Sequence, residues 1–221
     1  MVWSNEWENK IYGKNQQLND YPWSNVITLY NRFYTKDKIN KNFLELGCGA
    51  CNNLGFFLNE GFNCYGIDGS KSAISYAIKK FKNEKILKLN LSVGDFSENI
   101  GFKDIKFDII LDRASICHNK YSKIIKIVND IHKVMKPGGI FLALDWYSIY
   151  HTNFKEGEEI DTNTFIKSAG QFKDIGTIFF ADYSLLKKIF KKFKIIYCVE
   201  NKKIDIITNQ VTSSYSLVLQ K

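Results

Sequence analysis

The 221-residue sequence predicts an α/β fold, a doubly wound and mostly parallel seven-stranded sheet whose last strand is antiparallel. Apolar strand segments alternate with amphipathic helical segments, which implies parallel strands joined by right-handed crossovers. The segments 109–111 and 140–144 are apolar throughout, as in strands that are covered on both faces. The last two strand segments, 194–199 and 213–219, are joined by the polar residues 200–212, which predicts a closing antiparallel pair.

The composition indicates one globular domain. A hydrophobic fraction of 45% and an aromatic fraction of 15% supply a core. The polar, acidic start of the chain, Met1–Glu8, lacks the basic and apolar regions of a signal peptide. No apolar run reaches the roughly 18 residues that a membrane span needs. The five cysteines, an odd number, indicate reduced thiols. We therefore expect a cytoplasmic protein without a membrane segment.

The formal net charge of +8 comes mostly from lysines, many of them on predicted helix faces. This pattern favours a solvated surface. The alternative is attraction to an anionic partner, either a phosphorylated metabolite or nucleic acid. Because the sequence has no compact block of Arg and Lys, nucleic acid is the less favoured partner.

Residues 1–40 form an aromatic leader that has no place in a minimal alternating sheet. Pro22 can open a helix, because the N–H that it lacks would be unpaired in the first turn. Apolar residues then recur at steps of three and four: Val26, Ile27, Tyr30, Phe33 and Tyr34. We predict that 1–40 is a helical lid over the pocket. The alternative is that its aromatic rings belong to the core.

The first half of the sheet follows. The strand that ends at Leu46 runs into the turn Gly47-Cys48-Gly49 and a helix over 51–60, and a glycine, Gly61, ends that helix. A second strand, 63–67, closes on Asp68. Ser70 caps the next helix, about 72–81, with its apolar stripe inward at Ile74, Ala77, Ile78 and Phe81. The third strand covers about 88–93.

The second half repeats this pattern. A fourth strand, 107–111, leads into Asp112 and Arg113, and a helix over about 122–135 is broken by Lys136–Gly139. The fifth strand is 140–145. Residues 146–181 are polar and irregular, and we expect an acceptor-side insert, since long loops in compact domains are usually functional or disordered. A last helix, 183–193, precedes the final strand pair, so the domain spans 41–221.

Polar residues at the ends of the strands predict a pocket for a nucleotide-like ligand. A glycine turn followed about 20 residues later by an acid, Asp68, is typical of such pockets. Asp95 follows the neighbouring strand, and open α/β sheets bind ligands at this carboxyl edge. Cys48 and Cys51 have C-x-x-C spacing, but no second pair or nearby histidine accompanies them. We therefore predict no metal site.

Five segments in this order resemble the motifs of the class I S-adenosylmethionine-dependent methyltransferases, in their small-molecule branch. They are Leu44–Gly49, Gly66–Ser70, Val93–Phe96, Phe107–Asp112 and Val134–Gly139, and the resemblance covers roughly 40–221. The nearest competitor is an NAD(P) dehydrogenase. Its turn needs a third small residue, whereas this turn reads G-x-G-x-x-N.

The resemblance implies S-adenosyl-L-methionine as cofactor and S-adenosyl-L-homocysteine as product. It also implies that Asp68 holds the ribose hydroxyls, that Asp95 meets the adenine amino group, and that Phe96 flanks the ring. Aromatic and acidic neighbours suit a sulfonium cation. The candidate cofactor-binding residues are Tyr12, Trp23, Glu45, Gly47, Cys48, Gly49, Asn53, Asp68, Gly69, Ser70, Gly94, Asp95, Phe96, Asp112 and Arg113.

The candidate catalytic residues are two histidines. His118 follows the fourth strand, and an unperturbed histidine pKa near 6.5 suits proton transfer at neutral pH. His151 lies in the insert, whereas His132 lies within a helix and reads as structural. For either catalytic candidate, the alternative is a loop histidine bonded to backbone. Arg113 can bind a carboxylate or a phosphate, on the cofactor or on the acceptor.

These observations predict transfer of a methyl group to O or N of a small, anionic metabolite, such as a sugar phosphate, a nucleotide sugar or a surface-glycan precursor. The protein can be a monomer or a homodimer. One alternative is a nucleic-acid methyltransferase, but Asp112-Arg113-Ala114-Ser115 stands where its Asn/Asp-Pro-Pro-aromatic motif would be. The other is a non-catalytic scaffold that keeps the cofactor pocket.

Overall fold

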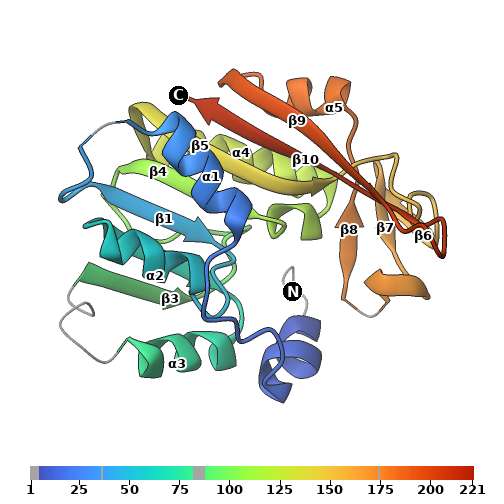
Figure 1. The fold of residues 1–221 in the computed structure, drawn as a ribbon, viewed down its shortest axis with the longest axis horizontal. Coiled ribbons are helices and arrows are strands. Elements are labelled where there is room, and N and C mark those ends of the chain that lie inside the picture. The colour runs from blue at the N-terminus through green and yellow to red at the C-terminus, as the bar shows by residue number, and fades with distance from the viewer. Residues whose placement is uncertain (1–4, 36, 82–87, 174) are drawn as a thin grey trace.

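The computed structural model describes residues 5–35, 37–81, 88–173 and 175–221, so positions 1–4 and 36 of the expected lid lie outside the described residues. Its centre is a seven-stranded sheet of order β3-β2-β1-β4-β5-β10-β9 (Figure 1). The predicted fold class is confirmed, because β10 is antiparallel to both β5 and β9 and the first five strands are parallel. The strands are β1 (Asn42–Leu46), β2 (Asn63–Asp68), β3 (Leu89–Val93), β4 (Phe107–Arg113), β5 (Met135–Tyr147), β9 (Lys194–Ile204) and β10 (Val211–Gln220).

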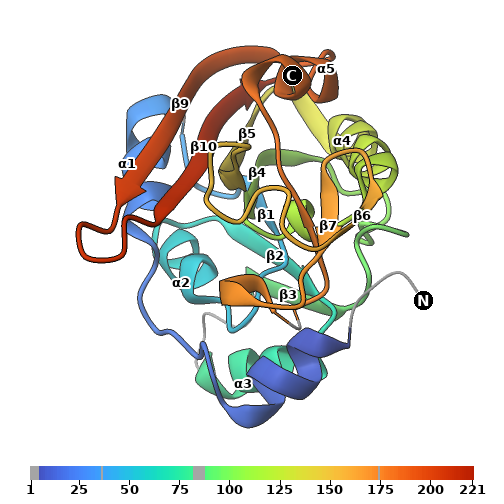
Figure 2. The ribbon, with the colours of Figure 1, turned by 90° about the vertical axis from the view of Figure 1, so that its right-hand side faces the viewer.

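Helices cover both faces of this sheet (Figure 2). One face packs against α1 (Ser24–Phe33), α2 (Asn52–Asn59) and α3 (Lys71–Lys80), and the other against α4 (Tyr121–Val134) and α5 (Tyr183–Ile189). Strands with two covered faces must be apolar throughout, which is why the central strands read as continuous hydrophobic runs. No helix among the described residues is long and apolar enough to cross a membrane.

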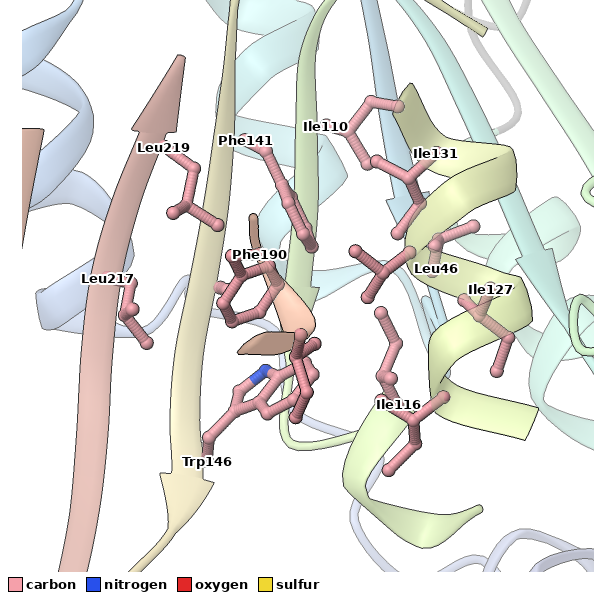
Figure 3. Close-up of a cluster of buried hydrophobic side chains, with 14 of the residues drawn as sticks. Leu46, Ile110, Ile116, Ile127, Ile131, Phe141, Trp146, Phe190, Leu217 and Leu219 are labelled. Atoms are coloured by element: carbon pink, nitrogen blue, oxygen red, sulfur yellow. The ribbon is translucent and has the colours of Figure 1, made fainter. Parts of the chain in front are cut away.

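Trp146 lies in the core between the sheet and the second helical layer, near Phe190 (Figure 3). Ile127 and Ile131 of α4 belong to the same cluster, and burial of each such side chain stabilises the fold by roughly 1.5–3 kcal/mol. The indole Nε1–H of Trp146 donates to Asp112 Oδ2 at 2.7 Å. Because Asp112 lies near the end of β4, this bond connects the core to the carboxyl end of that strand.

Local sequence signals explain the helix starts. Ser70 Oγ accepts from the backbone N–H of Ala73 at 3.0 Å, which confirms the predicted cap of α3. The prediction that Ile78 points inward is wrong, since 49% of this residue is exposed. β3 is the edge strand, so the sheet ends beneath this helix and only part of its apolar stripe is covered.

Several strand boundaries differ from those expected. β5 begins at Met135, directly after α4, so Lys136–Gly139 end the helix as expected but already belong to the strand. Backbone hydrogen bonds to Lys221 hold residues 136–139 in the sheet: Gly138 N–H donates to Lys221 O, and Lys221 N–H donates to Gly139 O. At the other end, β9 and β10 extend to Ile204 and Val211, so the hairpin loop is 205–210 rather than 200–212.

The expectation that 146–181 is irregular is wrong. The segment forms a second, antiparallel sheet of β6 (Glu158–Asp161), β7 (Thr164–Ile166) and β8 (Thr177–Phe179), in front in Figure 2. Strands of three or four residues are too short to show a clear alternation in sequence. The small sheet has its own buried cluster, formed by Phe165, Phe172, Ile178 and Phe180.

The leader divides into two parts. Helix α1 forms where the apolar spacing predicts it, and it packs on the sheet through Val26, Leu29 and Tyr30, so these residues belong to the core. Ahead of it, a π-helical turn (Trp7–Ile11) and a 3-10 turn (Tyr12–Lys14) run beside α3, at the bottom of Figure 1. This earlier part reaches the cavity described next, together with the residues that connect it to α1 and the first two residues of α1, Ser24 and Asn25.

Candidate active site

A cavity of about 980 Å³ opens along the carboxyl edge of the main sheet. This volume is at the upper end of the range for small-molecule pockets, about 300–1,000 Å³. Its wall combines the turn after β1, the ends of the neighbouring strands, the leader, the β9–β10 hairpin and residues of the insert outside the small sheet: His151, Gln171, Phe172 and Ile175. Segments that are far apart in the sequence therefore share one site.

Two glycines shape the turn after β1. Gly47 and Gly49 have φ angles of +65° and +51°, a region that side chains rarely adopt. A Cβ on Gly47 would lie 2.4 Å from the side chain of Ser115, and a Cβ on Gly49 would lie 2.4 Å from the Tyr12 hydroxyl. Both positions therefore require glycine, and the Tyr12 ring lies directly against the turn. Cys48 lines the cavity between them, although its thiol is buried.

Asp68 is held in place by the backbone around it. Its Oδ2 accepts from Gly49 N–H and its Oδ1 from Ser70 N–H, both at 2.8 Å. Burial raises the pKa of this carboxyl. Asp68 and Gly69 line the cavity together with Asp95, and Phe96 lies beside them. Of the residues predicted for this region, the cavity wall does not include Ser70 or Gly94.

Glu45 is a buried acid in the cavity wall with one oxygen unpaired. Its Oε1 accepts from Asn53 Nδ2 at 2.7 Å, whereas Oε2 has no hydrogen-bond partner among the described residues. Burial raises its pKa to about 8. Asn53 in turn accepts from the backbone N–H of Trp23 at 3.0 Å, which ties the leader to this site. A buried polar atom without a partner is costly, so Oε2 marks a position where a ligand donor fits.

Asp112 does not reach the cavity. It is fully buried behind the wall, where it accepts from Ser115 N–H, Ser115 Oγ and Ile116 N–H in addition to Trp146. Burial raises its pKa to about 6. These bonds shape the loop after β4, in which Ala114 takes a positive φ of 53°. In this structure the geometry gives Asp112 a positioning role.

Arg113 lines the cavity in an ion pair. Its Nε lies 2.9 Å from Asp145 Oδ2, and its guanidinium carbon lies 3.6 Å from the centre of the Trp23 ring. Asn25 Nδ2 donates to the other oxygen of Asp145 at 3.0 Å. Asp145 has a φ of +59°, a strained conformation that is common at functional sites. Sequence reasoning treated Asp145 only as the end of a strand, although an acid after an apolar run was a signal.

His118 contributes a neutral imidazole to the wall. Its ring lies 5.2 Å from that of Trp7 and 6.0 Å from that of Tyr147, with Nδ1 buried and unpaired among the described residues. Burial lowers the pKa of His118 to about 4. Thr177 Oγ1 donates to its carbonyl oxygen at 2.8 Å, so β8 positions this loop. The ring is thus unprotonated at neutral pH.

His151 lines the same cavity, but both of its ring nitrogens already have partners. Nδ1 accepts from the backbone N–H of Asn153 at 3.1 Å, and Nε2 lies 2.8 Å from the amide nitrogen of Gln171. An accepting Nδ1 places the proton of the neutral ring on Nε2. A hydrogen bond from Nε2–H to Gln171 then requires the amide to turn its oxygen, in place of its nitrogen, toward the ring. Burial, with the Lys167 ammonium nearby, lowers the pKa of His151. The geometry favours a hydrogen-bonding role for this residue.

Several residues in or near the wall had no signal in the sequence. Glu8, outside the wall, accepts from the Ser70 hydroxyl and from both the N–H and the hydroxyl of Ser72, which fastens the leader to the start of α3. Unforeseen residues of the wall itself come from the leader, the insert and the hairpin, among them Trp7, Gln171, Phe172, Asn201, Lys203, Thr212, Ser213 and Ser214. Contacts between such distant segments depend on tertiary packing.

No cluster of three or more metal-binding side chains occurs in the described part of the chain. All five cysteines are free, and Cys48 and Cys51 are buried next to the glycine turn. Burial raises the pKa of the Cys48 thiol well above its usual value. A buried thiol with a raised pKa is neither a good metal ligand nor a good nucleophile.

Known proteins similar to this chain are methyltransferases. A family model for a methyltransferase domain matches residues 37–212. An uncharacterized methyltransferase of Bacillus subtilis is 29% identical over 105 residues, which are 48% of this chain and 40% of that protein. Three methyltransferases of Schizosaccharomyces pombe are 37% identical over 75 residues, 34% of this chain and 50% of each relative. The matches thus span half or less of the curated relatives' length.

Solved structures extend the likeness to the whole fold. An S-adenosylmethionine-dependent methyltransferase of Methanosarcina mazei has a TM-score of 0.70 at 16% identity, covering 91% of this chain and 98% of that one. Phosphoethanolamine N-methyltransferase 2 of Haemonchus contortus has a TM-score of 0.72 at 14% identity, covering 100% of this chain and 61% of that one. Since the family model covers most of the chain, this chain belongs to the methyltransferase-domain family, and it has the fold of the class I S-adenosylmethionine-dependent methyltransferases.

Proposed function

We propose that this methyltransferase transfers the methyl group of S-adenosylmethionine to O or N of a small, anionic metabolite, such as a sugar phosphate, a nucleotide sugar or a surface-glycan precursor. One observation carries the proposal. A single cavity joins the glycine turn and strand-end acids to a second wall that bears Arg113, the two histidines and the hairpin. A cavity of this kind has room for a cofactor and an acceptor side by side.

The residues at the first wall fit the cofactor chemically. When bound, S-adenosylmethionine supplies an electrophilic methyl group on a positively charged sulfur. Glu45 offers a carboxyl oxygen that has no partner among the described residues, and Asp68 and Asp95 offer acceptors for hydroxyl and amino groups. Phe96 and Tyr12 supply aromatic faces beside the glycine turn. Aromatic faces attract cations by roughly 0.5–2 kcal/mol.

For the transfer itself, the chain's residues align the acceptor and exclude water. Alignment of two reactants is a large source of acceleration, with effective molarities of up to about 10⁵–10⁸ M. His118 is unprotonated at neutral pH and can accept a hydrogen bond from the acceptor. His151, with Nε2 carrying the proton, can donate one when Gln171 turns away. We propose that both orient the acceptor, with the early leader (residues 5–23) as its lid.

Charge supports the anionic acceptor. The second wall carries two cations, Arg113 and Lys203, and the chain as a whole has a net charge of +8. The Haemonchus contortus neighbour was solved with phosphomonomethylethanolamine, a phosphate-bearing compound, and with S-adenosylhomocysteine. A phosphate-bearing acceptor of this size agrees with both observations.

Calorimetric titration with S-adenosylhomocysteine tests the cofactor half of the proposal. Wild type should bind it saturably, and Asp68→Asn should weaken binding at least about tenfold. Both carboxylate oxygens of Asp68 accept from backbone N–H groups, whereas the side chain of Asn has only one oxygen and would turn its NH₂ group toward one of these donors. Asp104→Asn is the matched control, since Asp104 is exposed and does not line the cavity. A folded wild type that fails to bind S-adenosylhomocysteine would refute the proposal.

An acceptor screen tests the other half. Candidate metabolites are offered in pairs with and without a phosphate group, and S-adenosylhomocysteine formation is measured. The phosphorylated member of a pair should be the better substrate. Cofactor binding without turnover on any pair would favour the non-catalytic scaffold instead.

A further inference from the structure

The acidic side chains of the cavity wall lie along one part of the sheet edge, and the hairpin at its other end carries none. Among the described wall residues the acids are Glu45, Asp68, Asp95 and Asp145, which follow or belong to β1, β2, β3 and β5. The far side is formed by the β9–β10 hairpin, at the opposite end of the strand order from β3. The hairpin presents no carboxylate to the cavity, and its one cation there is Lys203.

The hairpin turns mainly one face toward the cavity, and Ser213 of the other face also lines it. In the antiparallel register Lys203 pairs with Thr212 and Asn201 pairs with Ser214, and all four residues line the cavity. Side chains alternate along a strand, so residues two apart share a face. This face therefore carries an ammonium, a carboxamide and two hydroxyls, which are all groups that can donate hydrogen bonds to an anion.

Other bonds hold this face in position. Val211 N–H donates to Thr152 Oγ1 at 2.7 Å, and Thr152 N–H donates to Val211 O at 2.9 Å. Glu200 lies on the opposite face of the strand, where its Oε1 accepts from the Ser148 and Ser213 hydroxyls. The segment 148–152 also carries His151, so these hydrogen bonds connect the hairpin directly to the part of the wall that bears His151.

The two cationic side chains of the cavity wall, Arg113 and Lys203, differ in whether a carboxylate of the chain pairs with them. Arg113 is paired with Asp145 and stacked on Trp23. Lys203 forms no ion pair with a carboxylate of the described chain. An unpaired ammonium at the rim of a cavity is available to an incoming anion, and Lys203 is exposed, so it can reach one without rearrangement of the fold.

We propose that the cavity-facing side of the β9–β10 hairpin is an oxyanion subsite, in which Lys203, assisted by Asn201, Thr212 and Ser214, holds a phosphate or carboxylate group of the methyl acceptor. This proposal rests on the proposed function for its acceptor, and it adds where the charged end of that acceptor binds. The reacting atom of the acceptor then lies on the opposite side, toward Trp7, His118 and Tyr147.

The chain offers a matched control for Lys203. Its neighbour Lys202 is also exposed but lies on the other face of the strand, where its ammonium stands 4.1 Å from the centre of the Tyr150 ring. Lys202→Gln and Lys203→Gln therefore remove the same charge from the same hairpin. Only the second variant alters the proposed subsite.

The test uses the full chain with saturating S-adenosylhomocysteine, titrated with inorganic phosphate and followed by ³¹P NMR, with acetate as competitor in a second series. Wild type should bind phosphate saturably, Lys203→Gln should weaken it at least about fivefold, and Lys202→Gln should change it less than about twofold. Displacement of phosphate by acetate at similar concentration indicates a carboxylate subsite, whereas resistance to acetate indicates a phosphate subsite.

Three results would overturn the proposal: no phosphate binding by wild type, equal weakening by the two lysine variants, or loss of binding in Arg113→Gln with none in Lys203→Gln. The affinity for S-adenosylhomocysteine is measured for every variant and should not depend on Lys203. If wild type fails to bind S-adenosylhomocysteine, the proposed function fails, and the phosphate titration of the protein alone still decides the fate of the subsite.

Discussion

Glu45 shows how a single buried acid in the cavity wall can lower stability. Its Oε1 is satisfied by Asn53, but Oε2 is buried without a hydrogen-bond partner in the described part of the chain, and burial raises its pKa to about 8. A raised carboxyl pKa means that the folded state binds the proton more tightly than the unfolded state. Its stabilising contribution is therefore present below the unfolded value near 4.5 and is lost as the pH rises through about 8.

Glu45→Gln should remove this loss. Without cofactor, the variant should match wild type in free energy of unfolding at pH 4.5 and exceed it at pH 8.5 by on the order of 4 kcal/mol, since the pKa rises from 4.5 to about 8 on folding and one pKa unit corresponds to about 1.4 kcal/mol. Urea denaturation at the two pH values measures the difference. A difference that does not change with pH would contradict the burial argument. The variant should also bind S-adenosylhomocysteine more weakly than wild type.

His118 makes a separate prediction at the residue scale. Because burial lowers its pKa to about 4, its ring should stay neutral between pH 7.5 and pH 5. The ring-proton NMR signal of His118, assigned by its absence in His118→Asn, should therefore not move over this range. A titration of that signal near pH 6.5 would show that the ring is solvated and would restore His118 as an ordinary general base.

At the scale of elements, the carboxylate of Glu8 fastens the first turn of the early leader to α3. Glu8 bridges the Ser70 and Ser72 hydroxyls at the start of α3, and these hydrogen bonds lower its pKa. Tyr12, a few residues later, lies against the glycine turn. If this segment closes over the cofactor, release of the cofactor requires these bonds to break.

Glu8→Ala should accordingly speed the dissociation of S-adenosylhomocysteine by about tenfold, because hydrogen bonds to a charged group contribute roughly 1.5–3 kcal/mol. Stopped-flow fluorescence of the leader's tryptophans measures this rate. Glu6→Ala is the control, since Glu6 pairs with Lys10 on the same turn. Equal rates for both variants and wild type would mean that the segment is not a lid.

For the molecule as a whole, the net charge of +8 raises the question of nucleic acid. The charge is spread over the surface, and the one cavity cation without a carboxylate partner in the described chain is Lys203. RNA binding, where detectable at 50 mM salt, should therefore be non-specific and should fall at least about tenfold by 200 mM salt. A gel shift that persists at 200 mM salt would contradict this and revive a nucleic-acid acceptor.

Much of the cofactor end could be predicted because its signals are local. The glycines at 47 and 49 are needed for a backbone conformation, and Asp68 and Asp95 follow strands whose apolar runs are visible in the sequence. The errors lie where tertiary context decides. Ile78 fits an apolar stripe but overhangs the sheet edge, and the strands of the insert are too short to show a period.

The sequence by itself determined the fold class, the methyltransferase family, and the edge of the sheet at which the cavity opens, which is formed by the carboxyl ends of the parallel strands. All three follow from periodicity and short motifs. Only the tertiary structure decided which residues meet there. Asp112 turns into the core, Glu8 reaches α3, and Lys203 faces the same cavity as Asp68. The physical reason is that side-chain direction and long-range contact depend on packing between segments that no local pattern encodes.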